Sequence, residues 1–235
     1  DEKGKTWRDY VRDMRLEITC GEAPYLVSRY DAVTGEPISA LDMRIGLLDR
    51  KLRVVSENTE TSGEWIDWAK TALECTYGYE WQGDNLLLAR EALLYTYIEY
   101  FMDKFNEKDE EGHYIKDANG NLRVPERRKI VNAACWISWN LWQMDGIKMV
   151  VPDSCDKVYD TNLFGEQEKK TCPACQKGEM KGHIGIQCII RDWNLKKPKN
   201  WQPKPGEDPH TQPWQKITFS SLLNAHQTET EDDEI

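Results

Sequence analysis

Four residues near the C-terminal end of the chain have the spacing of metal ligands. Cys172, Cys175, His183 and Cys188 follow the pattern Cys-x2-Cys-x7-His-x4-Cys. Zn²⁺ binds thiolate and imidazole groups in tetrahedral sites, and a Cys-x-x-Cys turn presents two sulfur atoms on one side. Four protein ligands leave no open position, so the pattern predicts a structural zinc site. The alternatives are a free dithiol or a redox pair, although no thioredoxin-like strand and helix frame surrounds the cysteines.

Acidic and glycine residues also stand where three predicted strands end. These strand ends are Cys20-Gly21-Glu22, Glu80-Trp81 and Asp145-Gly146. In open parallel sheets, ligands bind beyond the carboxyl ends of the strands. A glycine turn lets backbone amides approach a ligand, one acid can accept both hydroxyls of a ribose, and another can hold an adenine amino group. The strand ends are suited to a nucleoside, although acids end many strands that bind nothing.

The elements that must position these residues follow from hydrophobic periodicity. Apolar residues at three- and four-residue spacing predict helices near 23–30, 45–55, 65–73 (capped by Ser62), 84–105 and 125–139. Short β-branched or aromatic runs predict strands at 15–20, 76–81, 141–146 and 187–191, and Asn119-Gly120 predicts a hairpin within 113–124. Strands alternate with helices, which favours a mostly parallel sheet covered on both faces.

The sequence changes character after the third of these strand ends. Residues 1–151 form the predicted α/β domain, and residues 152–235 form an appendage with the cysteine motif. The appendage also holds a Pro/Lys/Trp-rich stretch at 196–214 and an acidic tail, Glu229–Glu234. The Lys/Trp-rich stretch could touch a phosphate backbone, but an exposed linker is the alternative. The remaining histidines are expected to be solvated side chains, namely His113, His210 and His226.

Three segments resemble the cofactor motifs of the N6-adenine DNA methyltransferases of restriction systems. Residues 15–26, Arg-Leu-Glu-Ile-Thr-Cys-Gly-Glu-Ala-Pro-Tyr-Leu, resemble the first motif, Leu-Glu-Pro-Ala-Cys-Gly-x-Gly-x-Phe-Leu. Residues 77–85 resemble the second, Tyr-Gly-Ile-Glu followed by Asp-Asn, and residues 140–146 resemble the third, Asn-Ile-x-x-Gly-Asp-x-Leu. The motifs stand in the family's order, and the phrases at 18–31 and 46–53 are similar to a subgroup of restriction-system M subunits.

The resemblance implies a partial Rossmann-like class I methyltransferase fold that binds S-adenosyl-L-methionine, with a small zinc-binding appendage. The residues implied to line the methionine end of this cofactor are Glu17, Thr19, Cys20, Gly21 and Tyr25. Those implied at the adenosine end are Glu80 for the ribose hydroxyls, Trp81 for the adenine face, and Asp145 with Gly146 for the adenine amino group. As alternatives, Tyr25 and Trp81 could be core aromatics and Asp145 a turn-forming residue.

The departures from the family pattern are as informative as the matches. Ala23 stands where the first motif has its second glycine, which narrows the turn. The catalytic motif, Asn-Pro-Pro-Tyr or Asp-Pro-Pro-Tyr, is absent, since no two prolines are adjacent in the sequence. That motif holds the flipped adenine, so the chain alone has no site for methyl transfer. We therefore expect a split enzyme, inactive alone, whose partner subunit carries the Asn-Pro-Pro-Tyr motif and the target-recognition region.

The charge of the chain agrees with a partner subunit that contacts the DNA. The 235 residues carry a formal net charge of −10, whereas affinity for duplex DNA rests largely on Lys and Arg. Double-stranded DNA is therefore expected to be bound through the complex and mainly by the partner. No apolar run approaches the length of a membrane span, and we expect a cytoplasmic protein. The alternative function is a non-catalytic, zinc-stabilised interaction or DNA-binding accessory protein of a restriction-modification system.

Overall fold

The computed structural model describes residues 4–31, 33–205 and 211–222. The chain divides into two compact units, Asp1–Leu141 and Trp142–Ile235. The acidic tail Glu229–Glu234, together with His210 and His226, lies outside the described residues. None of the described helices is long and apolar enough to cross a membrane.

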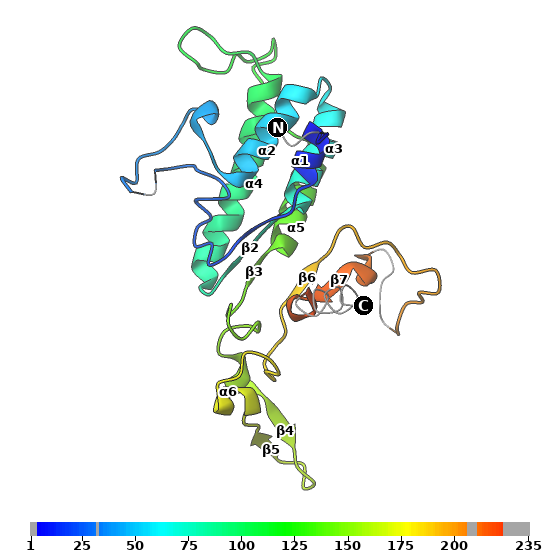
Figure 1. The fold of residues 1–235 in the computed structure, drawn as a ribbon. Coiled ribbons are helices and arrows are strands. Elements are labelled where there is room, and N and C mark those ends of the chain that lie inside the picture. Colours follow the sequence, from blue (N-terminus) through cyan, green and yellow to red (C-terminus); the bar gives the residue numbers. More distant parts are fainter. Residues whose placement is uncertain (1–3, 32, 206–210, 223–235) are drawn as a thin grey trace. The chain divides into compact units, whose positions relative to one another are not determined.

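The first unit combines helices with a small sheet (Figure 1). Its helices are α1 (Trp7–Arg12), α2 (Leu47–Asn58), α3 (Ser62–Glu74), α4 (Gly83–Phe105) and α5 (Arg127–Asn140), with a 3-10 helix at Leu41–Met43. Its strands are β1 (Arg15–Glu17) and β2 (Thr76–Glu80). Strand β3 (Leu141–Gln143) begins at Leu141, the last residue of the first unit. The strand order is β1-β2-β3, and β1 runs parallel to β2 with Leu16 opposite Tyr77. The chain is therefore mixed α/β with a small parallel three-stranded sheet.

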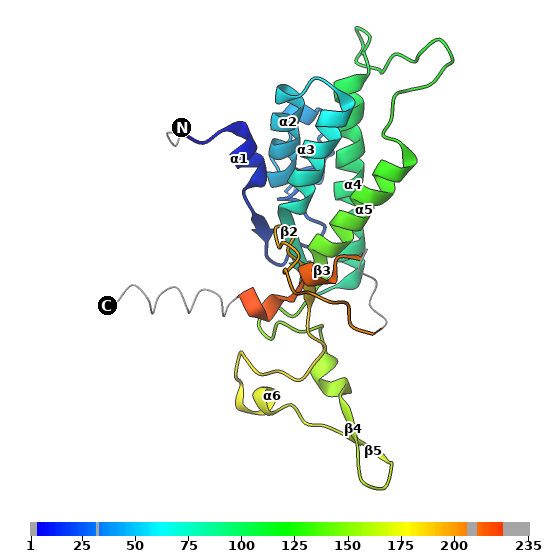
Figure 2. The same ribbon diagram turned by 90° about the vertical axis from the view of Figure 1, so that its right-hand side faces the viewer.

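Four helices of the first unit lie side by side, as Figure 2 shows, and enclose its hydrophobic core. Helices α2 and α5 each pack against both α3 and α4. Trp65 of α3 is fully buried, with its ring 5.4 Å from the rings of both Tyr97 and Phe101 of α4. These residues belong to the apolar stripes at helical spacing, so the predicted helices near 45–55, 65–73, 84–105 and 125–139 are confirmed.

A buried lysine joins the ends of two of these helices. The side chain of Lys51 is fully buried, and its Nζ donates to the carbonyl oxygens of Asp13 and Cys75. Asp13 ends α1 and Cys75 ends α3, and the last carbonyls of a helix have no intrahelical donor. Burial lowers the pKa of Lys51 to about 8. Because β1 and β2 begin directly after these helix ends, Lys51 also fixes the starts of both strands.

Two local predictions for the first unit are wrong. No helix forms over 23–30, because Ala23 adopts a left-handed φ of 63° and the N–H of Leu26 donates to the Glu17 carboxylate, 3.0 Å away. The cap of α3 is Thr61, whose side chain accepts a hydrogen bond from the N–H of Glu64, and not Ser62.

The predicted hairpin within 113–124 is only partly present. The turn around Asn119-Gly120 forms, with the N–H of Asp117 donating to the carbonyl of Asn121 at 2.8 Å. Named strands do not flank it; the described residues there make one isolated bridge, between Lys108 and Tyr114. The segment is mostly exposed, so it has no apolar face that would stabilise a two-stranded sheet.

The second unit is made of short elements. They are β4 (Tyr159–Thr161), β5 (Gln167–Lys169), α6 (Pro173–Lys177), β6 (Ile189–Arg191) and β7 (Lys216–Thr218), with 3-10 helices at Ser154–Lys157 and Pro213–Gln215. Strands β4 and β5 form one antiparallel pair, and β6 and β7 form another. The predicted strand at 187–191 is confirmed as β6. A small core is formed by Val150, Cys155, Cys172 and Ala174, so two of the cysteines belong to it.

Candidate metal centre and cofactor site

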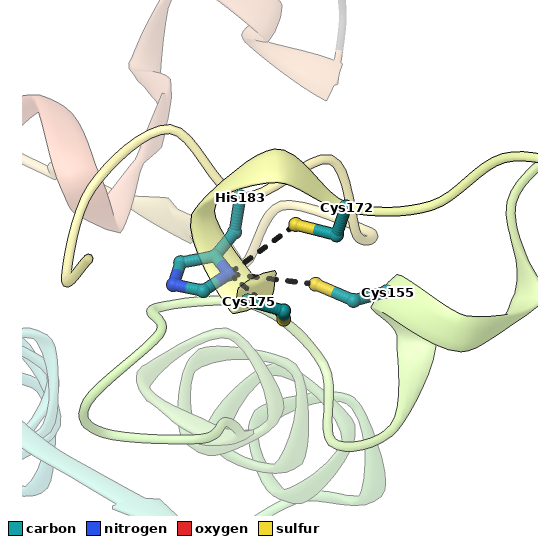
Figure 3. Close-up of side chains that lie close together, drawn as sticks. All are labelled: Cys155, Cys172, Cys175 and His183. Carbon is teal, nitrogen blue, oxygen red and sulfur yellow. Dashed lines mark hydrogen bonds between the residues drawn. The ribbon is translucent and has the colours of Figure 1, made fainter. Parts of the chain in front are cut away.

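Three cysteines and one histidine of the second unit point toward a common centre (Figure 3). The ligand atoms of Cys155, Cys172, Cys175 and His183 all lie within 4.8 Å of one another. His183 Nδ1 is 3.7 Å from Cys155 Sγ, 3.6 Å from Cys172 Sγ and 3.4 Å from Cys175 Sγ. A tetrahedral zinc with Zn–S near 2.3 Å and Zn–N near 2.0 Å would set each N···S separation at about 3.6 Å. The cluster could therefore hold a metal ion such as zinc.

The second nitrogen of the histidine ring also has a partner. His183 Nε2 lies 2.8 Å from the carbonyl oxygen of Glu179. A proton on Nε2 would be donated to this oxygen, which leaves the lone pair of Nδ1 directed at the three sulfur atoms. Metal-binding histidines commonly have their other nitrogen fixed in this way by a carbonyl or carboxylate. The ring is therefore oriented with Nδ1 toward the three sulfur atoms.

The cysteine turn places two sulfur atoms at the start of a short helix. Cys172 is the N-cap of α6, and Cys175 lies within its five residues. Burial raises the pKa of the Cys172 thiol, but hydrogen bonds from Ile184, Cys175 and His183 outweigh burial and lower this pKa to about 6. Burial and the neighbouring sulfurs raise the pKa of Cys175 to about 11. One thiolate therefore forms readily, and a cation at the centre would offset the repulsion between further thiolates.

The predicted ligand set is wrong in one position. The sulfur of Cys188 lies outside the cluster and donates to the carbonyl oxygen of Gln143 at 3.3 Å. The backbone of Cys188 is tied into the β6–β7 pair, since its carbonyl accepts the N–H of Phe219. The fourth residue of the cluster is Cys155, and the β4–β5 hairpin between them brings Cys172 next to it. The sequence carries no spacing signal for Cys155, because its place in the cluster depends on the fold of the hairpin between it and Cys172.

The loop after β1 has a strained backbone. Between Glu17 and Leu26, φ is 48° at Thr19, 54° at Gly21 and 63° at Ala23. The left-handed region costs an ordinary residue about 1–2 kcal/mol, and a β-branched residue such as Thr19 is a rare occupant. Strain of this kind persists where the surrounding structure enforces it, and it concentrates at functional sites. The loop that the first motif predicts as a cofactor turn is therefore unusual in its backbone as well as in its sequence.

The predicted residues at the ends of β1 and β2 meet in space. The N–H of Gly21 donates to Glu80 Oε2 at 2.9 Å, and the N–H of Gln82 donates to Glu80 Oε1 at 3.1 Å. Glu80 is buried, and no protein cation accompanies it among the described ion pairs. The structure thus brings together a glycine turn and a carboxylate from neighbouring parallel strands, as the strand-end argument predicts.

Glu17 and Cys20 lie beneath this loop. Burial raises the pKa of Glu17 to about 7, although the backbone N–H of Leu26 and a second hydrogen bond from Tyr25 act in the opposite direction. Burial, together with the charges of Glu17 and Glu80, raises the pKa of the Cys20 thiol to about 12. Cys20 is therefore a neutral packing residue, while Glu17 changes its charge near neutral pH.

The two aromatic candidates are exposed. Tyr25 is 70% exposed and Trp81 is 45% exposed, so neither is a core aromatic. Thr19 is exposed as well, and its Oγ1 donates to the carbonyl of Ile18. Trp81 is thus an exposed tryptophan that directly follows a buried carboxylate in the sequence.

Asp145 and Gly146 belong to the second unit. Asp145 Oδ1 accepts the N–H groups of Ile147 at 3.0 Å and Lys148 at 3.1 Å, which forms an Asx turn. The carboxylate also lies 3.8 Å from the Lys148 ammonium. Asp145 therefore has a clear local role as a turn-forming residue, whatever else it binds.

Comparison of the whole chain with protein-family models, with curated protein sequences and with solved structures finds no match.

Proposed function

We propose that this chain is the S-adenosyl-L-methionine-binding subunit of a split DNA adenine-N6 methyltransferase. The observation that supports it best is the contact of Gly21 with Glu80 under a strained loop, at the carboxyl ends of two parallel strands. Ligands of parallel sheets bind at this edge, and backbone strain there is expected to serve binding. The resemblance of residues 15–26 and 77–85 to two cofactor motifs indicates that the ligand is S-adenosyl-L-methionine.

The chemistry of the donor set fits the cofactor. Glu80 would accept the ribose hydroxyls with the lone pairs that Gly21 and Gln82 leave open, and exposed Trp81 would cover the adenine face. Glu17, in its ionised form, would face the ammonium group of the methionine end. The bound cofactor supplies the methyl group, and the residues of this chain would bind and orient it.

The partner would supply what this chain lacks. The sequence has no Asn-Pro-Pro-Tyr motif, and its net charge of −10 is unsuited to gripping DNA alone. A second subunit would therefore hold the flipped adenine and contact double-stranded DNA. The Cys155/Cys172/Cys175/His183 cluster would bind zinc as a structural ion, because its four ligands leave no open coordination position.

Calorimetric titration with S-adenosyl-L-methionine tests the proposal. The assembled complex of the chain with a subunit that carries the Asn-Pro-Pro-Tyr motif, identified by co-purification, should bind the cofactor and methylate adenine in duplex DNA. Glu80→Ala should abolish cofactor binding while assembly is retained, and Glu91→Ala, at an exposed position of α4, should change neither. The proposal is wrong if the assembled complex neither binds the cofactor nor transfers methyl groups.

The second candidate function is a zinc-stabilised accessory protein that has lost cofactor binding. The observation that favours it is Ala23, which occupies a left-handed turn where the motif has glycine. This candidate predicts stoichiometric zinc together with no binding of S-adenosyl-L-methionine in the assembled complex. The same titration, combined with metal analysis, separates the two functions.

A further inference from the structure

The β4–β5 hairpin of the second unit connects two residues of the metal cluster. It spans Tyr159–Thr161 and Gln167–Lys169, and so lies between Cys155 and Cys172 in the chain (Figure 1). All six strand residues are exposed, so the hairpin covers no core of its own. A metal bound at the cluster would anchor the chain at both ends of the hairpin.

The tip of this hairpin is a well-defined turn. Asn162 Oδ1 accepts the N–H groups of Phe164 at 3.0 Å and Glu166 at 2.9 Å. The N–H of Gly165 donates to the Asn162 carbonyl at 3.0 Å, with a φ of 80° that suits glycine. The two residues at the top of the turn, Leu163 and Phe164, are therefore held in a fixed geometry by the residues around them.

Among the described residues of the second unit, these two have the most exposed large apolar side chains. Leu163 is fully exposed and Phe164 is 90% exposed. A single exposed apolar side chain is ordinary, but two adjacent ones at the tip of a hydrogen-bonded turn resemble the anchors that fill a pocket on a partner. Burying such side chains is the main source of free energy in protein association.

The charges around the tip indicate what kind of partner fits. Asp160 stands directly opposite Glu168 in the register, and Glu166 lies beside them. Like charges opposite each other destabilise a strand pair. An exposed contact of Asp160 with Lys170 at 3.8 Å and the hydrogen bonds from Asn162 Nδ2 to Glu166 and Glu168 offset part of this repulsion. Cations of a partner would relieve the repulsion, whereas DNA phosphates or an anionic lipid surface would increase it.

We infer that the tip of the β4–β5 hairpin is a docking element that inserts Leu163 and Phe164 into an apolar pocket of a partner protein, rimmed by Lys or Arg. This inference rests on the proposed function, which supplies the partner: the subunit that carries the catalytic motif. The acidic residues of the hairpin then meet the basic rim, and the metal cluster holds the base of the hairpin.

The test measures the affinity of the full chain for the Asn-Pro-Pro-Tyr protein by biolayer interferometry. The double variant Leu163→Ser/Phe164→Ser should weaken binding at least tenfold, with unchanged zinc content, melting temperature and cofactor binding. The control is Val33→Ser, which removes an equally exposed apolar side chain from a turn of the first unit and should not change the affinity.

A charge variant separates docking from the stability of the hairpin. Glu168→Lys places a cation opposite Asp160, so it should stabilise the isolated hairpin but weaken binding at least threefold, because it opposes the basic rim. Binding of the wild-type chain should weaken as salt is added, and the variant should show a smaller salt dependence.

Each outcome decides the question. Equal affinity of the double variant and the wild-type chain would overturn the docking role while leaving the split enzyme intact. Loss of binding to a DNA duplex or to phosphatidylserine vesicles in the double variant, with protein binding retained, would also overturn it. If the wild-type chain and Val33→Ser both fail to bind the Asn-Pro-Pro-Tyr protein, the proposed split enzyme is wrong, and so is this docking role.

Discussion

Gly185 lies so close to Cys155 that only a glycine fits. A Cβ atom at position 185 would lie 3.0 Å from Cys155 Sγ and 2.4 Å from Ser154 Oγ. Ser154 cannot easily give way, because its Oγ donates to the Val151 carbonyl and accepts the N–H of Ile186. The segment between His183 and Ile186 therefore packs directly on the turn that carries a metal ligand.

Gly185→Ala should weaken zinc binding at least tenfold, because the added methyl group displaces the Cys155 sulfur from the tetrahedral position. Competition with a chromophoric chelator measures this change. Gly63→Ala is the matched control, since its methyl group would meet open space in α3. Unchanged zinc affinity in Gly185→Ala would mean that Cys155 is not held as a ligand.

The corrected ligand set makes a prediction that separates two buried cysteines. Cys155→Ser should remove one of three thiolates and lower the thiolate-to-metal charge-transfer absorption of the cobalt-substituted protein by about a third. Cys188→Ser should leave this absorption unchanged, because Cys188 Sγ lies outside the cluster and donates to the Gln143 carbonyl. The opposite result would restore the ligand set read from motif spacing.

The sequence predicts local features better than it predicts contacts between residues that are far apart in the chain. Helical periodicity located α2 to α5 because each helix buries an apolar stripe in one core. The strand ends that carry Gly21 and Glu80 were expected at one edge of the sheet, but the hydrogen bond between these two residues was not predicted. Cys155 was missed because its place in the cluster depends on a hairpin whose exposed strands carry no hydrophobic pattern.

The phrase at 46–53 shows a second limit. Its residues looked like a marker of a subgroup, and the structure gives three of them structural roles. A Cβ at Gly46 would lie 2.5 Å from the Leu26 carbonyl oxygen, and Asp49 Oδ2 accepts the N–H of Ser28 at 2.7 Å. Lys51 binds the two helix ends. Such long-range backbone contacts leave no periodic signal, so they could not be derived from spacing.

Stability should depend on pH through Glu17. Its pKa rises from 4.5 to about 7 on folding, so the folded chain binds more protons than the unfolded chain between these values. The contribution of Glu17 to stability is therefore largest below about pH 4.5 and is lost as pH rises through about 7, a change of up to about 3 kcal/mol. Glu17→Gln keeps an oxygen for the Leu26 N–H and should lack this loss.

Urea unfolding of the wild-type chain and Glu17→Gln, from about pH 4.5 to about pH 8, measures this difference. Glu91→Gln is the control, since Glu91 is exposed and should follow the wild-type curve. Parallel curves for Glu17→Gln and the wild-type chain would show that Glu17 keeps an ordinary pKa in the folded protein.

Substitutions at Ala23 should reveal the strain in the loop after β1. Ala23 is fully buried at a φ of 63°. Ala23→Gly relieves the left-handed strain but loses a buried methyl group, so the free energy of unfolding should change by less than about 1 kcal/mol. Ala23→Val adds a β-branched side chain there and should cost at least about 2 kcal/mol. A tolerated valine would contradict the left-handed backbone.

Lys51→Met should destabilise the first unit. Methionine fills the same space but leaves the carbonyl oxygens of Asp13 and Cys75 buried without a donor. Each unsatisfied group costs about 1–3 kcal/mol, and the removal of a buried charge returns part of this, so we expect a net loss of about 2 kcal/mol. Lys70→Met, at a partly exposed site of α3, should change stability by less than about 0.5 kcal/mol.

Because Lys51 fixes the starts of β1 and β2, the Lys51→Met variant should also bind the cofactor more weakly in the assembled complex. If Lys51→Met loses stability but binds the cofactor normally, Lys51 is not needed to position the ends of β1 and β2.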